Sequence, residues 1–153
     1  MANYNTSKIG YAFTNIDDTQ LYPLNSRARD EAGNEYIYLK GVVSTVLGSW
    51  VTYDEVGVTT LLAANAIGQV AIAQAATVAN KFGWYLIVGS CQAKVSAGFA
   101  DNGNVYATAT PGEADDAVVA GDRVKCATGR SAISGGLALM QVNYPYMDDG
   151  LAA

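Results

Sequence analysis

The side chains that most often carry out acid–base and nucleophilic chemistry are scarce in this chain. It contains no histidine, which removes the commonest general base and the usual partner of a serine or cysteine nucleophile. The nearest match to a nucleophile elbow, at residues 129–133, lacks the second glycine of that motif and reads as a loop. The sequence therefore predicts no catalytic residue and a protein that is not an enzyme.

Paired carboxylates are the remaining candidates for hydrolytic chemistry. Adjacent aspartates occur at positions 17–18, 115–116 and 148–149. Neighbours on an extended chain point in opposite directions, so adjacency does not make a catalytic dyad. Each pair falls in an expected loop or tail and is interpreted as solvated. A small carboxylate-based hydrolase, which needs two distant acids brought together in a cleft, is the less favoured alternative.

Metal and cofactor sites have little support. Cys91 and Cys126 are far apart in the chain, and without histidine they cannot complete a structural zinc site. Residues 101–104 lack the spaced acidic ligands and distal glutamate of a calcium loop. No metal and no cofactor are expected. Both thiols are interpreted as buried and free, with a mutual disulfide as the alternative.

Composition and charge limit the partners. The 153 residues, 50% of them hydrophobic, suffice for one domain with a substantial core. A net charge of −5 argues against sequence-independent binding to nucleic acid or anionic lipid. The first residues contain no apolar secretory segment, so synthesis in a cytoplasm is expected. Polar residues and Gly68 interrupt the uncharged run 56–80, which predicts two soluble elements instead of a membrane span.

The elements that would hold any site in place are short strands. Residues 81–91 predict a central strand with two apolar faces, Trp84, Leu86 and Val88 on one and Tyr85 and Ile87 on the other. Residues 24–39 predict a hairpin with its turn at 31–34. Its return strand places Ile37 and Leu39 inward, and Tyr36, Tyr38 and Lys40 toward solvent or a partner.

Further elements follow along the chain. Residues 93–110 predict a second hairpin with its turn at 100–103 and with Tyr106 facing outward. Residues 59–65 could form a single helical turn. Residues 137–144 predict a last strand, which Pro145 is expected to end. Four of its residues share one face: Ala138, Met140, Val142 and Tyr144.

Together these elements predict an all-β fold. We expect a single-domain antiparallel β-barrel or β-sandwich of about nine or ten short strands. Residues 1–19 are expected to form an extended N-terminal arm, 20–145 the β domain and 146–153 a C-terminal tail.

Tyrosines are the unusual feature of the composition. Several of the 10 fall on the arm or on expected outward strand faces, where tyrosine suits protein interfaces. Together with the nearest approach to a basic group, they give a candidate partner interface: Tyr4, Tyr11, Phe13, Arg27, Arg29, Tyr36 and Tyr38.

Four segments resemble a known class of protein. Residues 33–42, 48–55, 81–89 and 121–124 are similar to segments of tailed-bacteriophage head proteins. More narrowly, residues 20–145 resemble the small capsid cement, or decoration, proteins. No catalytic motif belongs to this resemblance, and it supplies no role for the two cysteines.

The resemblance implies a location and partners. It implies a β subunit that assembles on the outer surface of the virion capsid, often as a trimer, and ties neighbouring major capsid proteins together. The expected partners are therefore the major capsid protein and further copies of this chain, with no nucleic acid and no membrane. The alternative is a tail or head-fibre β module that binds a host glycan through exposed aromatic residues.

Overall fold

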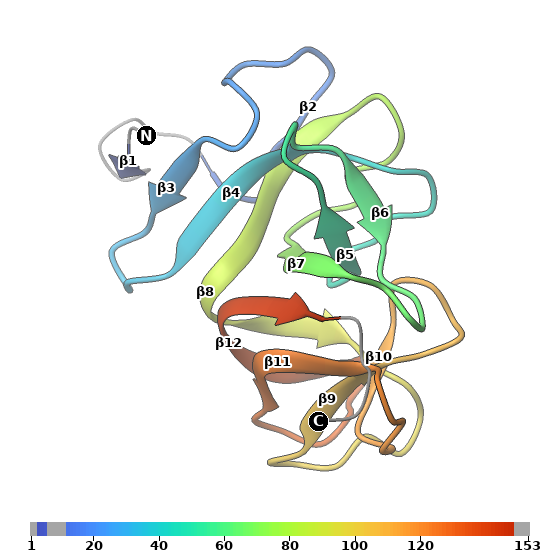
Figure 1. The fold of residues 1–153 in the computed structure, drawn as a ribbon. Helices are drawn as coiled ribbons and strands as arrows, with labels where there is room; N and C mark the ends of the chain where they lie inside the picture. The colour runs from blue at the N-terminus through green and yellow to red at the C-terminus, as the bar shows by residue number, and fades with distance from the viewer. Residues whose placement is uncertain (1–2, 6–11, 149–153) are drawn as a thin grey trace.

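The computed structural model describes residues 3–5 and 12–148, and in this part of the chain every regular element is a β-strand. All 12 strands belong to one sheet (Figure 1). The first six are β1 (Asn3–Asn5), β2 (Ile16–Asp17), β3 (Arg27–Arg29), β4 (Glu35–Lys40), β5 (Trp50–Tyr53) and β6 (Thr59–Leu61). The others are β7 (Gly68–Ala73), β8 (Phe82–Lys94), β9 (Asn104–Ala107), β10 (Ala114–Asp115), β11 (Arg123–Gly129) and β12 (Leu137–Met147).

The predicted all-β class is confirmed, with more strands than the nine or ten expected. Every pairing between named strands is antiparallel except that of β1 with β3. The helical turn expected at residues 59–65 is wrong, because Thr59–Leu61 is a strand paired with β5. No helix among the described residues has the length and apolarity that crossing a membrane requires.

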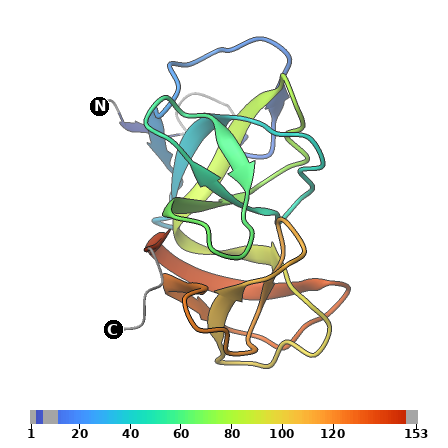
Figure 2. The ribbon, with the colours of Figure 1, turned by 45° about the vertical axis from the view of Figure 1, so that its right-hand side comes forward.

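The strand predicted to be central, β8, joins the two halves of the molecule. Its first part pairs with β4 and β7, and its second part pairs with β12. Gly89 lies near the start of the second part, opposite Val142; its φ of 116° favours glycine and its position leaves no room for a Cβ beside Asn34. Figures 1 and 2 show β8 running from the half that contains β3 to β7 into the half that contains β9 to β12.

Both faces of β8 are covered, as the sequence predicts. Trp84 and Leu86 pack in the larger apolar cluster, which extends through both halves, and Tyr85 and Ile87 pack in a smaller one. Val88 departs from the predicted alternation and contacts the smaller cluster. The reason is a bulge: Tyr36 of β4 pairs with Leu86, but Glu35 pairs with Val88, so β8 has one extra residue at this step.

The smaller cluster fills a curled part of the sheet. Strands β4, β8, β7, β5 and β6 are neighbours in that order, and a bridge between Lys40 and Val58 brings the end of β4 to the start of β6. The Thr59 hydroxyl donates to the Lys40 carbonyl at 2.7 Å. The strands thus form a partly closed barrel, consistent with the predicted choice between barrel and sandwich.

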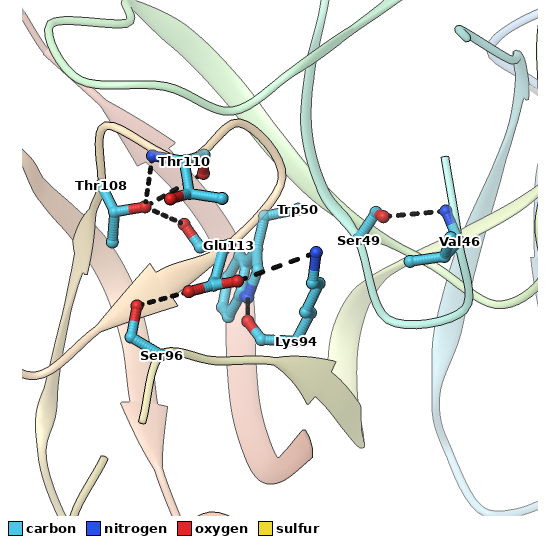
Figure 3. A network of polar contacts seen from close by, with 8 residues as sticks. All are labelled: Val46, Ser49, Trp50, Lys94, Ser96, Thr108, Thr110 and Glu113. Atoms are coloured by element: carbon cyan, nitrogen blue, oxygen red, sulfur yellow. Dashed lines mark hydrogen bonds and ion pairs between the residues drawn. The ribbon is translucent and has the colours of Figure 1, made fainter. Parts of the chain in front are cut away.

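A polar network fastens the two halves to each other (Figure 3). The Trp50 indole, from β5, donates to the carbonyl of Lys94 at 3.1 Å. The Lys94 ammonium lies 3.7 Å from the Glu113 carboxylate, which accepts a hydrogen bond of 2.6 Å from the Ser96 hydroxyl. Because Trp50 is fully buried and its polar atom is satisfied, this contact fixes the halves in one arrangement.

Two other local predictions are wrong. Residues 93–110 are not a hairpin: β9 pairs with β10 and β11, and β8 pairs with β12. After Lys94 the chain leaves the sheet through a single bridge from Val95 to Ala114, and Phe99 is buried in the larger cluster. Tyr106, expected to face outward, is 7% exposed because β9 lies inside the sheet.

Pro145 does not end the last strand, which continues to Met147. Between the pairs Ala127–Val142 and Lys125–Tyr146, β12 contains two more residues than β11. Proline is tolerated in such a bulge because no regular ladder hydrogen bond is lost. Within it Tyr144 adopts a φ of 50° and is 43% exposed, so it does not share the buried face of Ala138, Met140 and Val142.

Candidate partner-binding surface

Three of the predicted contact residues form an aromatic clamp in the interior. The Phe13 ring stacks on Tyr36 with 3.8 Å between ring centroids and meets Trp84 edge-on at 5.5 Å. Tyr38 lies 5.1 Å from Trp84 and is completely buried, and Tyr36 is 7% exposed. The prediction that Tyr36 and Tyr38 face solvent or a partner is wrong, because the segment before β3 covers this face of β4.

Polar contacts complete the clamp. The Tyr38 hydroxyl donates to the Asp17 carboxylate at 2.6 Å and accepts from the Leu21 amide at 3.2 Å. The Tyr36 hydroxyl donates to Asp30 at 3.0 Å. Burial raises the pKa of both phenols, and the neighbouring aspartates raise it further. These tyrosines fasten the start of the chain to β4 and offer no surface to a partner.

Arg27 and Arg29 remain at the surface and share one carboxylate. Arg27 donates to Glu35 at 3.4 Å and Arg29 donates to it at 3.2 Å. Tyr144 donates its hydroxyl to the same Glu35 side chain at 3.0 Å, and the Arg27 guanidinium lies over the Tyr144 ring at 5.5 Å. The side chain of Glu35 is only 5% exposed. The cluster therefore links the β3–β4 hairpin to β12.

The N-terminal strand lies beside this cluster. Residues of β1 pair in parallel with β3, so that Tyr4 is opposite Ala28 and its neighbours are opposite Arg27 and Arg29. Tyr11 lies outside the described residues. The candidate residues of the described part thus separate into a buried clamp and two surface arginines on β3, the strand with which β1 pairs.

A groove opens next to Arg27. Two adjacent hollows, of about 390 Å³ and about 400 Å³, share Tyr53, Asp54, Glu55 and Gln69. One is completed by Asn25, Arg27, Ile37 and Tyr144, and the other by Thr52, Val58, Thr60, Ile67 and Gly68. We call the two together the Tyr53 groove. It lies where β5 ends and β7 begins, with Ile37 of the smaller cluster at one side.

The adjacent carboxylates were expected in loops or tails, but Asp17 lies on β2 and Asp115 on β10. Asp18 pairs with Lys81 at 2.5 Å, and Asp116 accepts from the Ala100 amide at 2.8 Å. Asp148 pairs with Lys125, whereas Asp149 lies outside the described residues. Among residues 3–5 and 12–148, no group of three or more histidine, cysteine, aspartate or glutamate side chains is placed to hold a metal ion.

Both cysteines are free, as the favoured interpretation predicts. Cys91 is partly buried against the larger cluster, and burial raises the pKa of its thiol to about 12. Cys126 is exposed, which differs from the expectation of two buried thiols. The cause is the bulge opposite Tyr144, where Cys126 adopts a φ of 61°.

The sequence did not identify Glu35, Tyr144 or the Tyr53 groove as parts of this surface. The contact of Glu35 with Arg29 could have been predicted, because the tight turn at 31–34 places the two residues opposite each other. Tyr144 and the Tyr53 groove depend on contacts between distant strands, which no local pattern indicates. Exposed apolar loops were also missed: Val43 is 65% exposed, Leu47 52% and Val118 80%.

Comparison with known proteins gives a likeness of fold. No family model matches the chain, and no curated protein matches it. Its structure is similar to that of a chain from "The capsid of Myoviridae Phage XM1", with a TM-score of 0.52 and 15% sequence identity. The similarity covers 80% of this chain and 90% of that chain. The two chains therefore share an all-β fold over most of their lengths.

Proposed function

We propose that this chain is a structural virion protein that binds the outer surface of a phage capsid and cements neighbouring major capsid proteins. The observation that supports it best is the fold shared with a chain of a phage capsid structure over 80% of the present chain. The resemblance of residues 20–145 to capsid cement proteins, seen in the sequence, points to the same role. The mechanism is mechanical: a subunit that buries surface across adjacent capsomers adds binding energy to contacts that resist internal pressure.

The surface chemistry suits the exterior of a shell. A net charge of −5 disfavours a position against packaged DNA, and two of the basic side chains are engaged by Glu35. Exposed apolar side chains on loops, among them Val43, Leu47 and Val118, supply the surface that a protein interface buries. The partners in this proposal are the major capsid protein and further copies of this chain, arranged as a trimer.

The capsid contact is proposed to lie at the N-terminal strand and the adjacent arginines. β1 occupies the outer edge of β3 through backbone pairing, and a strand at a sheet edge is suited to pairing with another chain. Tyr4, Tyr11, Arg27 and Arg29 belong to this surface in the proposal. Phe13, Tyr36 and Tyr38 do not, because they pack against one another and Trp84.

The aromatic clamp limits how many N-terminal residues can be deleted without disturbing the core. Removing residues 2–15 would delete Phe13 and uncover Tyr36 and Trp84, so a loss of binding could reflect damage to the core. Removing residues 2–11 retains the clamp. We therefore expect the shorter deletion, which loses only the pairing of β1 with β3, to lower the urea midpoint slightly and the longer deletion to lower it much more.

Co-sedimentation with purified phage heads tests the proposal. The full chain is expected to pellet with the heads at saturable stoichiometry, and the 2–11 deletion is expected to pellet much less while remaining folded. A deletion of residues 149–153 serves as the control and is expected to bind like the full chain. Absence of the full chain from the pellet would overturn the capsid role, and undiminished binding of the 2–11 deletion would overturn the role of the arm.

A further inference from the structure

The Tyr53 groove contains polar side chains that the fold does not use. The Glu55 carboxylate and the Gln69 amide are exposed at its wall, and neither makes a side-chain hydrogen bond or ion pair within the described residues. Asp54, in contrast, holds the β5–β6 turn by accepting from the amides of Val56 at 3.1 Å and Val58 at 2.9 Å. Glu55 and Gln69 are therefore free to bind a ligand without weakening the fold.

The charges of the groove disfavour an anionic ligand throughout, and they disfavour a cationic ligand at the end that Arg27 lines. An anion would meet Asp54 and Glu55, and the Arg27 guanidinium that might attract it is already paired with Glu35. A cation at the Tyr144 ring would meet Arg27, which occupies that ring at 5.5 Å. A neutral polar ligand avoids both repulsions.

Hydrogen-bond donors and acceptors both line the groove. Glu55 only accepts hydrogen bonds, Arg27 only donates them, and the amides of Asn25 and Gln69 do both. A ligand that satisfies this mixture needs groups that donate and accept at once, which is the property of hydroxyls. The Tyr53 ring adds apolar surface beside these groups.

From these features we propose that the Tyr53 groove binds a neutral carbohydrate chain. The hydroxyls of the sugar pair with Glu55, Gln69 and Asn25, and one of its C–H faces lies against the Tyr53 ring. Each hollow, at about 400 Å³ or slightly less, is in the size range of small-ligand sites. Tyr53 and Gln69 are paired opposite each other on β5 and β7, so the walls are held rigidly by the sheet. This binding is additional to capsid attachment and does not depend on it.

An oligosaccharide array carrying neutral, anionic and cationic glycans tests the proposal with the labelled full chain. The groove variant combines Glu55→Gln with Gln69→Ala. The control is Gln92→Ala, because Gln92 is also an exposed strand glutamine and lies in the part of β8 that pairs with β12, outside the groove. Near-UV circular dichroism establishes that all three proteins are folded.

The expected result is binding to one or more neutral glycans, weakened at least tenfold in the groove variant and unchanged in Gln92→Ala. Calorimetric titration with the neutral glycan that gives the strongest signal measures the ratio. The proposal is overturned if no neutral glycan binds, if only charged glycans bind, or if the groove variant and the control bind equally.

Discussion

The Tyr144 hydroxyl donates a hydrogen bond of 3.0 Å to the buried carboxylate of Glu35, 109 positions away in the chain. The same carboxylate accepts from Arg27 and Arg29. One side chain thus holds the β3–β4 hairpin against β12 and closes one side of the Tyr53 groove through Arg27 and Tyr144. The stability of the hairpin and the shape of the groove therefore both depend on the contact between Tyr144 and Glu35.

Replacing Glu35 with glutamine should destabilise the protein. The substitution removes the charge that three donors share and leaves them with weaker partners. Because the arginines are partly exposed, water limits the loss to about 2 kcal/mol. Urea unfolding measures it, with Glu31→Gln as the control, since Glu31 is exposed in the turn of the same hairpin. Equal midpoints for the two variants would contradict the assigned role of Glu35.

Replacing Trp84 with alanine should cost about 3 to 5 kcal/mol, because the cavity left by a fully enclosed indole does not collapse. Trp84 is 1% exposed and is surrounded by Phe13, Tyr22 and Tyr38. Urea unfolding gives the free-energy difference. The control is Val118→Ala, expected within about 0.5 kcal/mol of the unmodified chain, because Val118 is 80% exposed. A near-neutral Trp84 variant would contradict the two-sided burial of β8.

The sequence predicted this strand well because burial on both faces leaves a local signature. Trp84, Tyr85, Leu86 and Ile87 all occupy the faces that alternation assigns. Val88 does not, because an extra residue at a bulge is set by the partner strand.

Which strands pair with each other was predicted less well than which residues are buried. Residues 93–110 were predicted to form a hairpin, yet β9 pairs with β10 and β11, and Phe99, between the two expected strands, is buried in the larger cluster. In the candidate site, too, local contacts could be predicted and contacts between distant strands could not. The pairing of Arg29 with Glu35 follows from a short turn, whereas Tyr144 reaches Glu35 only through the path of β12. Tyr36 and Tyr38 were assigned to the outside because a sequence does not show that residues before β3 fold back over β4.

Stability should fall at alkaline pH. Burial raises the pKa of Tyr85 from 10.0 to about 12, with nearby threonine hydroxyls partly opposing the effect. Between those values the folded state retains a proton that the unfolded state has lost, so stability decreases as pH rises from about 10 to about 12 and is unaffected well below 10. Tyr36 and Tyr38 act in the same direction.

Urea unfolding at a series of pH values measures the decrease. Tyr85→Phe should show a shallower fall above pH 10 than the unmodified chain, with both compared at about pH 8 as the reference. An unchanged slope would show that Tyr85 ionises equally in both states.

The cysteines should differ in reactivity. Cys126 is exposed, whereas the thiol of Cys91 has a pKa raised to about 12 by burial and is almost entirely protonated near neutrality. Iodoacetamide at about pH 8 without reductant should therefore add one group to the folded protein and two in concentrated urea. Intact-mass measurement counts the adducts, and peptide mapping assigns the first to Cys126. Two rapid adducts in the folded state would contradict the burial of Cys91, and none even in urea would indicate a disulfide.

The most direct test of the cementing role is the temperature at which phage heads release their DNA. Heads that lack this protein are compared with the same heads after saturation with the full chain, and release is followed by a dye that fluoresces on DNA. A protein that ties neighbouring capsid subunits together is expected to raise the release temperature in proportion to its occupancy, with a much smaller rise from the 2–11 deletion at the same concentration. An unchanged release temperature at full occupancy would contradict the cementing role.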